Sequence, residues 1–406
     1  MTLLKRFFLC LVCLILLTGC GLREENDNGF LVFTTKKTQT ALQPDDPVPA
    51  SEIRCCWLSY LELNPNRLTE ESAYRGYLKH LFSPLRELQI TDIFVQVRPF
   101  ADAIYPTAMF DSSAFVAGKR GARLPFDFLA LILEEAKQHG FRVHAWINPY
   151  RVLSDPKDMN LIGPQTSLGA LIRRRPDVLM TTADGVFLQP ASSDAQKLIL
   201  DGVREILQRY PVAGIHIDDY FYPPGSENRD DSFYKSYQSS GGTLTKSDWR
   251  RAQITALLRG LYRTVHSFGT DDVFSVSPGG NLQNDRTKHY AEIAEWCRED
   301  GCCDWMIPQL YYGFEHESLP FEKTAKQWRR ICSNQKIRLI GGLALYKDGK
   351  KDLFAGSGKD EWQEHADVIA RQIALLRRLG YDGFSLYSAQ FVNFQRKACQ
   401  TLQSVL

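Results

Sequence analysis

Short runs of β-branched and aromatic residues alternate along this chain with longer stretches in which apolar residues recur at helical spacing. The short runs predict eight strands, over residues 53–60, 92–99, 142–149, 214–221, 273–278, 305–312, 338–346 and 383–388. The longer stretches predict eight helices, over about 69–86, 126–139, 192–209, 245–267, 286–297, 320–332, 361–378 and 391–402. Capping serine and threonine precede two of these helices, and Gly140 and Gly380 follow two others, as is typical of helix ends.

Eight strands that alternate with eight helices predict an α/β fold in which a parallel sheet closes into a (β/α)8 TIM barrel. An open doubly wound sheet is the structural alternative, but no glycine-rich phosphate loop follows any predicted strand. The longest insertions, 153–192 and 223–245, follow the third and fourth strands. In a barrel they would lie at the C-terminal ends of the strands, where active sites are found.

Polar side chains occupy one face of most predicted strands. Successive side chains point to opposite sides of a strand, so the apolar set should face the surrounding helices. The other set then points into the barrel, and its members are Gln96, Arg98, His144, Trp146, Asn148, His216, Asp218, Ser275, Ser277, Gln309, Tyr311, Ser385 and Tyr387. Because buried polar groups cost energy unless they are paired or used, the C-terminal end of the barrel is the predicted site.

The most specific local motif is Gly214-Ile-His-Ile-Asp-Asp-Tyr-Phe-Tyr-Pro223. Asp218 should point inward and Asp219 sideways, and close negative charges raise the pKa of at least one carboxyl, which suits acid–base catalysis. A plainer interpretation is that Asp219 only holds neighbouring backbone or Arg98.

Aromatic residues gather at or near the predicted strand ends. They are Tyr60, Tyr105, Trp146, Tyr220, Tyr222, Tyr311, Tyr312 and Tyr387. Flat rings stack on sugar faces while their hydroxyl groups bind sugar hydroxyls, so this set favours a carbohydrate site.

The N-terminus is typical of an export signal. Lys5 and Arg6 precede an apolar run over 7–17, which is too short for a comfortable bilayer span. The run ends at Leu17-Thr-Gly-Cys20, the pattern of a bacterial lipoprotein signal, so we expect residues 1–19 to be cleaved and Cys20 to be lipidated. The alternative is an ordinary signal peptide with a chance cysteine. We expect residues 20–50 to form a flexible tether and residues 51–406 to form the barrel domain. The lipid on Cys20 would hold the protein on the extracytoplasmic side of a membrane.

The charge balance excludes two classes of protein. The 406 residues include 49 Lys and Arg against 47 Asp and Glu, and without residues 1–19 the formal net charge is zero. Neither a nucleic-acid binder that relies on bulk positive charge nor a highly charged disordered chain fits these counts.

Seven cysteines follow Cys20, an odd number that leaves at least one thiol free. Cys297, Cys302 and Cys303 could pair locally or with Cys332. No Cys or His spacing predicts a metal site, and we expect no cofactor.

The ordered motifs resemble the bacterial glycosyl-hydrolase-like family 10. They are Arg54-Cys-Cys-Trp57, Val97-Arg-Pro-Phe-Ala-Asp102, Tyr105-Pro106, His144-Ala-Trp-Ile-Asn-Pro149, Gln189-Pro190, the 214–223 motif, Ser275-Val-Ser-Pro278, Pro308-Gln-Leu-Tyr-Tyr312 and Gly383-Phe-Ser-Leu-Tyr387. The resemblance covers roughly residues 52–400. It implies a TIM barrel with glycosidase activity and, from exported lipoprotein members, cell-wall glycan as the substrate class. The matching polar positions are Asp102, His144, Asn148, Asp218, Asp219 and Tyr311.

Glycoside hydrolysis normally uses two carboxyl groups. We expect Asp218 to be one, and hypothesise that Glu315 or Asp102 completes the pair while Asp219 tunes Asp218. Arg98 would keep one carboxylate ionised, and His144, Asn148 and His216 would bind sugar hydroxyls or an N-acetyl group.

Two other functions stay open. One is a metal-dependent hydrolase or deacetylase built on His144, His216 and Asp218. The other is a carbohydrate-binding lipoprotein without catalytic activity.

Overall fold

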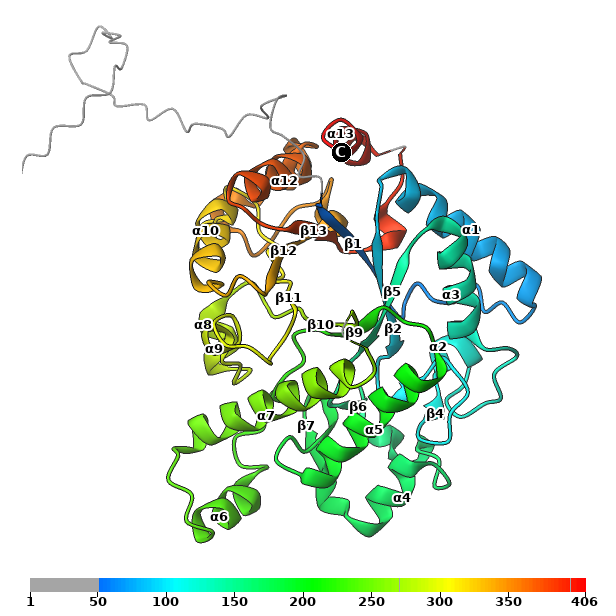
Figure 1. The fold of residues 1–406 in the computed structure, drawn as a ribbon, viewed down its shortest axis with the longest axis vertical. Helices are drawn as coiled ribbons and strands as arrows, with labels where there is room; N and C mark the ends of the chain where they lie inside the picture. The colour runs from blue at the N-terminus through cyan, green and yellow to red at the C-terminus, as the bar shows by residue number, and fades with distance from the viewer. Residues whose placement is uncertain (1–50, 270, 395) are drawn as a thin grey trace, which may run out of the picture. The chain divides into compact units, whose positions relative to one another are not determined.

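The computed structural model describes residues 51–269, 271–394 and 396–406. The predicted signal peptide, the tether and Cys20 lie outside the described residues. In Figure 1 the barrel strands form a closed ring that the helices surround. The eight strands are β1 (Ile53–Leu58), β2 (Asp92–Arg98), β5 (Arg142–Ile147), β9 (Gly214–Ile217), β10 (Val273–Val276), β11 (Trp305–Met306), β12 (Arg338–Leu343) and β13 (Gly383–Leu386).

All neighbouring barrel strands are parallel, in the order β1-β13-β12-β11-β10-β9-β5-β2. The predicted TIM barrel is therefore confirmed, and all eight predicted strands are present. The longer helices around the barrel are α1 (Glu71–Glu87), α3 (Phe128–His139), α5 (Ser193–Arg209), α7 (Lys246–His266), α10 (Phe321–Ile331) and α12 (Val368–Arg378). A C-terminal helix, α13 (Lys397–Gln403), follows β13.

The predicted helix ends are formed by the expected groups. The Ser192 hydroxyl accepts the N–H of Ala195 at 3.3 Å, and the Thr245 hydroxyl accepts that of Asp248 at 3.2 Å. Gly140 closes α3 in the left-handed conformation, with φ of 79°, which glycine adopts without strain. The local sequence signals thus fix where these helices begin and end.

Two predicted helices are broken. The one over 286–297 is two short helices, α8 (Leu282–Thr287) and α9 (Ile293–Trp296), because Tyr290 between them has φ of +51°. The one over 361–378 is α11 (Glu361–Glu364) followed by α12, because His365 has an extended backbone. At the first break, Nη1 of Arg250 on α7 donates to the Tyr290 hydroxyl at 2.7 Å.

Insertions at the C-terminal ends of the strands carry additional elements. After β2 come β3 (Asp102–Ala103), β4 (Asp111–Ser112) and α2 (Ala114–Ala117), an insertion that the sequence pattern did not indicate. After β5, β6 (Arg151–Leu153), β8 (Gly185–Leu188) and β7 (Leu179–Thr182) form a three-stranded sheet beside α4 (Ser167–Arg174). After β9 comes α6 (Asp231–Ser239).

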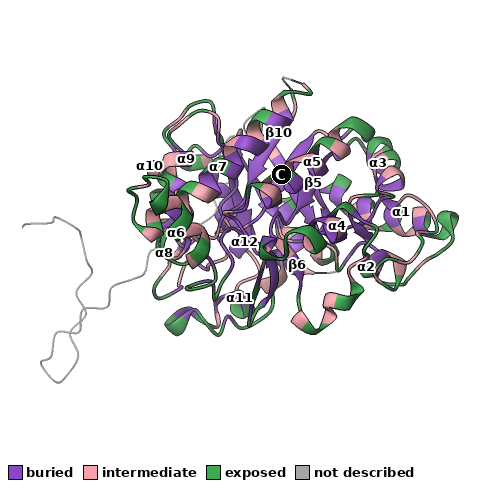
Figure 2. Ribbon diagram, turned by 90° about the horizontal axis from the view of Figure 1, so that it is seen from below, coloured by how far each residue is buried: buried purple, intermediate pink, exposed green. Residues whose placement is uncertain are grey.

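The core is divided between the layer outside the strands and the barrel interior. Figure 2 shows buried residues along the central strands and exposed ones on the outer sides of the helices. A separate interior cluster consists of Cys55, Trp57, Phe94, Trp146, Val273, Trp305, Ile307 and Ile340.

The seven described cysteines are buried free thiols. Within the described part of the chain, no helix has the length and apolar character needed to cross a bilayer.

Candidate active site

A cavity of about 300 Å³, which we call the mouth, opens at the C-terminal ends of the barrel strands. Its lining residues are Trp57, Tyr60, Leu61, Gln96, Trp146, Arg151, Asp218, Asp219, Tyr220, Gln309, Tyr311, Tyr346 and Tyr387. Each belongs to the C-terminal half of a barrel strand or to the segment that follows it. This is where a TIM barrel presents catalytic groups.

A chain of amides holds Asp218 at the mouth. Nδ2 of Asn148 lies 2.6 and 2.7 Å from the two carboxyl oxygens of Asp218. The Asn148 carbonyl in turn accepts a hydrogen bond from Gln96 at 2.6 Å, and Gln96 accepts the backbone N–H of Tyr60 at 3.1 Å. Asp218 is only 5 % exposed, so its position is set by these contacts rather than by solvent.

The two adjacent carboxyls differ in their partners and share a raised pKa. Burial, followed by the charge of Asp219, raises the pKa of Asp218 to about 7 although the Asn148 amide and Arg151 lower it. Burial also raises the pKa of Asp219, against the lowering effects of His289, of a hydrogen bond from Gln309 and of Arg151. Two buried carboxyls this close retain a proton near neutral pH, the state that a general acid requires.

Arg151 is a site residue that the sequence analysis missed. Its guanidinium lies 4.0 Å from the ring centre of Phe100 and 4.3 Å from that of Tyr220. Among the described residues it forms no ion pair, yet its charge lowers the pKa of both Asp218 and Asp219. It therefore has the electrostatic role that we had predicted for Arg98. The one feature of the sequence that could have pointed to Arg151 as a site residue is its place four residues beyond the end of β5.

Aromatic rings form the wall on the other side of the mouth. Tyr387 lies with its ring centre 5.9 Å from that of Trp57, and 6.0 Å from those of Tyr311 and Tyr346. Tyr220, at 41 % exposure, stands at the rim. Tyr346 also lines the mouth, although it was not among the residues expected there. These rings provide the flat faces that a sugar site needs.

The predicted histidines lie below the mouth and are completely buried. His216 accepts the indole N–H of Trp57 at 3.0 Å, and its Nδ1 lies 2.8 Å from the Ser275 hydroxyl. Burial lowers the pKa of His216 well below its usual range, so the ring is neutral. His144 Nε2 lies 2.8 Å from a carboxyl oxygen of Asp92. The hydrogen bonds that both histidines form are to other residues of the barrel, and neither ring lines the mouth, which corrects the expectation that they face the substrate.

Arg98 points out of the barrel, contrary to prediction. The pairing of β2 with β5 shifts between Gln96 and Arg98, so Arg98 pairs with the outward-facing Ile147. The guanidinium is 1 % exposed and lies 4.4 Å from the ring centre of Phe110. The bulge inverts the alternation on which the prediction rested.

Four other predicted residues also lie outside the mouth. Tyr105 is fully buried beside Tyr210, and the Tyr222 hydroxyl donates to Asp230. Asp102, on β3, accepts the backbone N–H of Phe100 at 3.0 Å. Glu315 follows β11 and is not among the residues that line the mouth. The mouth thus brings together Trp146, Asp218, Asp219, Tyr220, Gln309, Tyr311 and Tyr387, with Asn148 in contact with Asp218.

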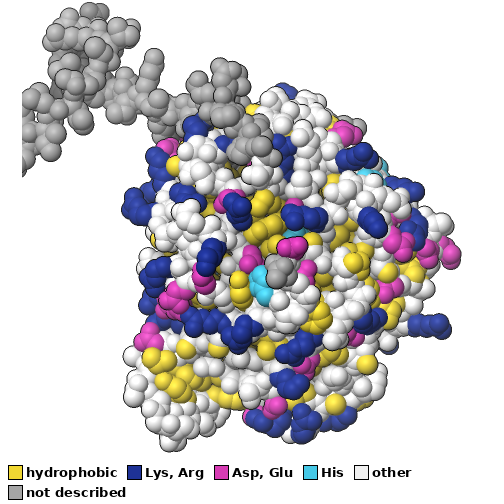
Figure 3. Space-filling model, in the orientation of Figure 1, with side chains coloured by type: hydrophobic (Ala, Val, Ile, Leu, Met, Phe, Trp, Pro, Cys, Tyr) yellow, Lys and Arg dark blue, Asp and Glu magenta, His cyan; other side chains and the backbone are white. Residues whose placement is uncertain are grey.

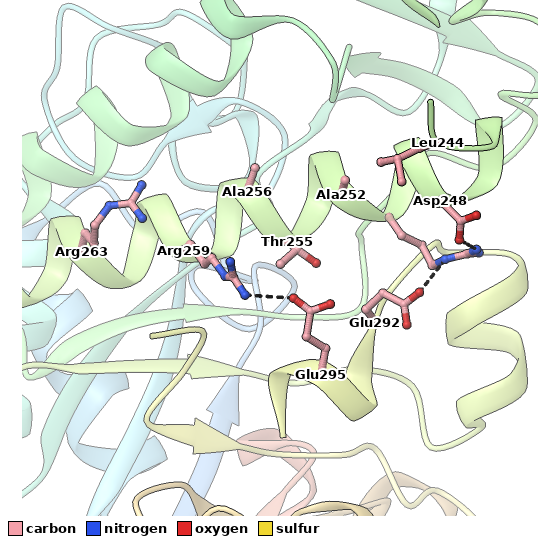
Figure 4. A pocket seen from close by; sticks show the side chains of 10 residues that line it. Leu244, Asp248, Ala252, Thr255, Ala256, Arg259, Arg263, Glu292 and Glu295 are labelled. Atoms are coloured by element: carbon pink, nitrogen blue, oxygen red, sulfur yellow. Dashed lines mark hydrogen bonds and ion pairs between the residues drawn. The ribbon is translucent and has the colours of Figure 1, made fainter. Parts of the chain in front are cut away.

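Cavity size alone does not select the site. A groove of about 550 Å³ runs between α7 and α9, outside the barrel (Figure 4). Its charges pair across it: Arg259 Nη2 lies 3.0 Å from Glu295, and Arg251 Nε lies 2.6 Å from Glu292.

No group of three possible metal ligands occurs among the described residues. On the face shown in Figure 3, basic and acidic side chains are interspersed.

Comparison with known proteins identifies the family. The model of the family described as glycosyl hydrolase-like 10 matches residues 52–354. The chain belongs to this family. Glycosyl hydrolase DigH of Escherichia coli strain K12 is 32 % identical over 310 residues, which cover 70 % of each chain. Glycosyl hydrolase YngK of Bacillus subtilis strain 168 is 27 % identical over 350 residues, 81 % of this chain and 66 % of that protein. The resemblance inferred from the motifs is confirmed.

Solved structures of glycosidases share the barrel of this glycosyl hydrolase-like 10 chain. The glycoside hydrolase domain of PgaB (BpsB) from Bordetella bronchiseptica superposes with a TM-score of 0.60 at 14 % identity, covering 87 % of this chain and 98 % of that one. α-L-Fucosidase isoenzyme 2 from Paenibacillus thiaminolyticus gives 0.54 at 13 % identity, covering 87 % and 49 %. At these identities the likeness shows the fold alone.

Proposed function

We propose that this chain is a glycosidase that uses Asp218 as its general acid. One observation supports this most directly: a buried carboxyl with a pKa of about 7 stands beside a second carboxyl at an aromatic mouth. A protonated Asp218 can transfer its proton to the leaving oxygen of a glycosidic bond. Of the four candidate acids, only Asp218 and Asp219 line the mouth.

We further propose that the substrate is the glycan strand of the bacterial cell wall. The family resemblance implies this class, and two properties of the mouth suit it. Cell-wall strands are built of 2-acetamido sugars, and every second sugar carries a lactyl ether that ends in a carboxylate when no stem peptide is attached. The aromatic wall suits the sugar rings. Arg151, whose guanidinium lies close to the rings of Phe100 and Tyr220, can offer its N–H groups to that carboxylate.

The test is incubation of the purified protein with cell-wall glycan strands, with and without their stem peptides, followed by mass spectrometry of the products. We expect cleavage by the wild type and none by Asp218→Asn. Equal cleavage by both proteins would refute the role of Asp218. Binding without any product would favour the carbohydrate-binding alternative, and activity lost on exhaustive chelation would favour the metal-dependent one. The histidines proposed for that alternative are committed to Asp92, Trp57 and Ser275.

We also propose that the chain is an exported lipoprotein anchored through Cys20 on the extracytoplasmic side of a membrane. The support is the Leu17-Thr-Gly-Cys20 pattern after a short apolar run. Metabolic labelling with palmitate should mark the wild-type protein and fail to mark Cys20→Ala. Equal labelling of both would contradict the anchor.

A further inference from the structure

The wall across the mouth from the paired carboxyls lacks an acid. In the closed strand order, β13 stands opposite β9, with β1 and β12 on either side of it. The side chains that these three strands and their following segments give to the mouth are Trp57, Tyr60, Leu61, Tyr346 and Tyr387. Among the described residues that line the mouth, the carboxyls are Asp218 and Asp219 alone, both from the end of β9.

This arrangement does not match the usual pair of glycosidase carboxyls. In that pair the acid and the nucleophile or base flank the scissile bond, about 5–5.5 Å apart in retaining enzymes and about 6.5–9.5 Å apart in inverting ones. Adjacent residues at one strand end approach the sugar from a single side of the mouth. A group that attacks the anomeric carbon from the other side must therefore come from elsewhere.

The groups on the opposite wall are poor candidates for that role. Tyrosine is the nucleophile in some glycosidases, but burial raises the pKa of Tyr346 to about 12 and that of Tyr387 further, so both remain protonated. Glu62 lies behind this wall and is 2 % exposed. Its carboxyl accepts the Ser388 hydroxyl at 2.7 Å and the backbone N–H groups of Ser59 and Gln390 at 2.6 and 2.8 Å.

We propose that the substrate supplies the nucleophile, through the carbonyl oxygen of the 2-acetamido group on the sugar whose anomeric carbon is attacked. This inference rests on the proposed glycosidase function. It names the substrate class for the mouth: a glycan with an intact N-acetyl group on the ring that precedes the cleaved bond. Catalysis through a substrate's own acetamido group is established chemistry for some glycosidases.

The two acids have different roles in the proposed reaction: Asp218 transfers protons, and Asp219 orients the acetamido group. The acetamido oxygen forms a bond to the anomeric carbon as the glycosidic C–O bond breaks, and the leaving oxygen takes the proton of Asp218. Asp219 accepts a hydrogen bond from the acetamido N–H and balances the positive charge of the resulting oxazolinium ring. Water then attacks the anomeric carbon and gives a proton to Asp218, and the ring opens to restore the acetamido group. The products retain their anomeric configuration.

Burial raises the pKa of Asp219, but its neighbours His289, Gln309 and Arg151 favour the ionised carboxylate. The Gln309 side chain hydrogen-bonds Asp219, and Nε2 of Gln309 is itself held by the backbone oxygen of Ser277 at 3.2 Å. His289 lines a second cavity, of about 200 Å³, on which Asp219 also borders. These contacts hold the carboxylate in place, as expected for a group that orients the acetamido N–H rather than one that attacks carbon.

The test compares peptide-free cell-wall glycan strands with the same strands after chemical N-deacetylation, and uses a thiazoline analogue of the bicyclic intermediate as an inhibitor. For the wild type we expect products of retained anomeric configuration by NMR and competitive inhibition by the thiazoline. We also expect kcat on deacetylated strands to be lower than on acetylated strands by about 100-fold or more. Inverted products, or equal kcat on both kinds of strand, would overturn the inference while leaving the proposed glycosidase intact. Absence of cleavage of every strand would overturn both.

Variants separate the two acids. With an aryl N-acetylglucosaminide whose phenol leaves without protonation, Asp218→Asn should regain most of its lost kcat/KM, which reports the step in which the phenol leaves. The kcat/KM of Asp219→Asn should remain about 100-fold or more below that of the wild type. Asp184→Asn, an exposed acid on the turn between β7 and β8, is the matched control and should retain wild-type kinetics. Recovery of Asp219→Asn on the aryl substrate would contradict its assigned role, and circular dichroism of each variant checks folding.

Discussion

Replacing Asp218 with asparagine should stabilise the fold in a manner that depends on pH, and this prediction needs no substrate. The carboxyl is 5 % exposed, and both oxygens already face the Asn148 amide. Asparagine has nearly the same shape and cannot ionise. Its carbonyl oxygen can accept from Asn148, whereas its amide nitrogen replaces an oxygen that also accepted from Asn148, a cost that does not vary with pH. The variant therefore removes the cost of a buried negative charge beside Asp219 while leaving the packing of the mouth nearly unchanged.

The sign and size follow from the pKa. Burial and the neighbouring charge raise the pKa of Asp218 to about 7 in the folded state, from about 4 in the unfolded chain. Below pH 4 both states are protonated, so Asp218 does not affect stability. Between pH 4 and 7 only the folded state keeps the proton, so the wild-type free energy of unfolding falls as pH rises. Above pH 7 the loss is complete at about 4 kcal/mol, or about 5 °C in Tm for a chain of this length.

Thermal unfolding of wild type, Asp218→Asn and the exposed control Asp184→Asn, measured from pH 4 to pH 9, tests this directly. We expect the Tm of Asp218→Asn, relative to that of the wild type, to rise by up to about 5 °C between pH 4 and pH 8. The control should follow the wild type throughout. A Tm difference that stays constant with pH, or one that falls as pH rises, would refute the reasoning.

Three further predictions concern the mouth. Arg151→Met keeps an unbranched side chain beside the rings of Phe100 and Tyr220 but removes the charge that lowers the pKa of the paired carboxyls. The basic limb of the pH–rate profile should therefore move to higher pH, and an unmoved limb would contradict this. Gly280→Ala would place a Cβ against the backbone oxygen of Gln309, so chemical denaturation should show a loss of about 1–3 kcal/mol, and an unchanged midpoint would contradict the clash. Tyr387→Phe should keep kcat within about tenfold of the wild type, because the phenol is not the nucleophile; loss of activity approaching that of an acid variant would contradict this.

The barrel could be predicted from local signals because the alternation of short apolar runs with capped helices repeats eight times. Ser192 and Thr245 cap the helices that they were expected to cap, and Gly140 ends α3 in the left-handed conformation. The inserted strands could not be predicted in the same way. β3 and β4 are two residues each, and β6 pairs with β8 across more than thirty residues, so their pairing depends on tertiary contacts rather than on a periodic pattern.

The site was predictable where a residue immediately follows the strand ladder. Asp218 comes directly after β9 and Tyr387 directly after β13, and both reach the mouth. His144 and His216 lie within their ladders and are completely buried. Both kinds of residue show the same inward alternation, because alternation identifies the face of a strand and says nothing about depth along the barrel axis. Depth depends on where each strand ends relative to its neighbours.

The bulge in β2 shows why the face itself can also be misassigned. Strict alternation from Gln96 sends Arg98 inward, but one extra residue in the pairing with β5 turns it outward onto Phe110. Gln96 stays inside and supports Asn148, while Arg151 supplies positive charge to the mouth from the segment after β5. A buried acid pair needs nearby positive charge to keep one member ionised. Arg98 does not provide it, whereas Arg151 lowers the pKa of both carboxyls and His289 lowers that of Asp219.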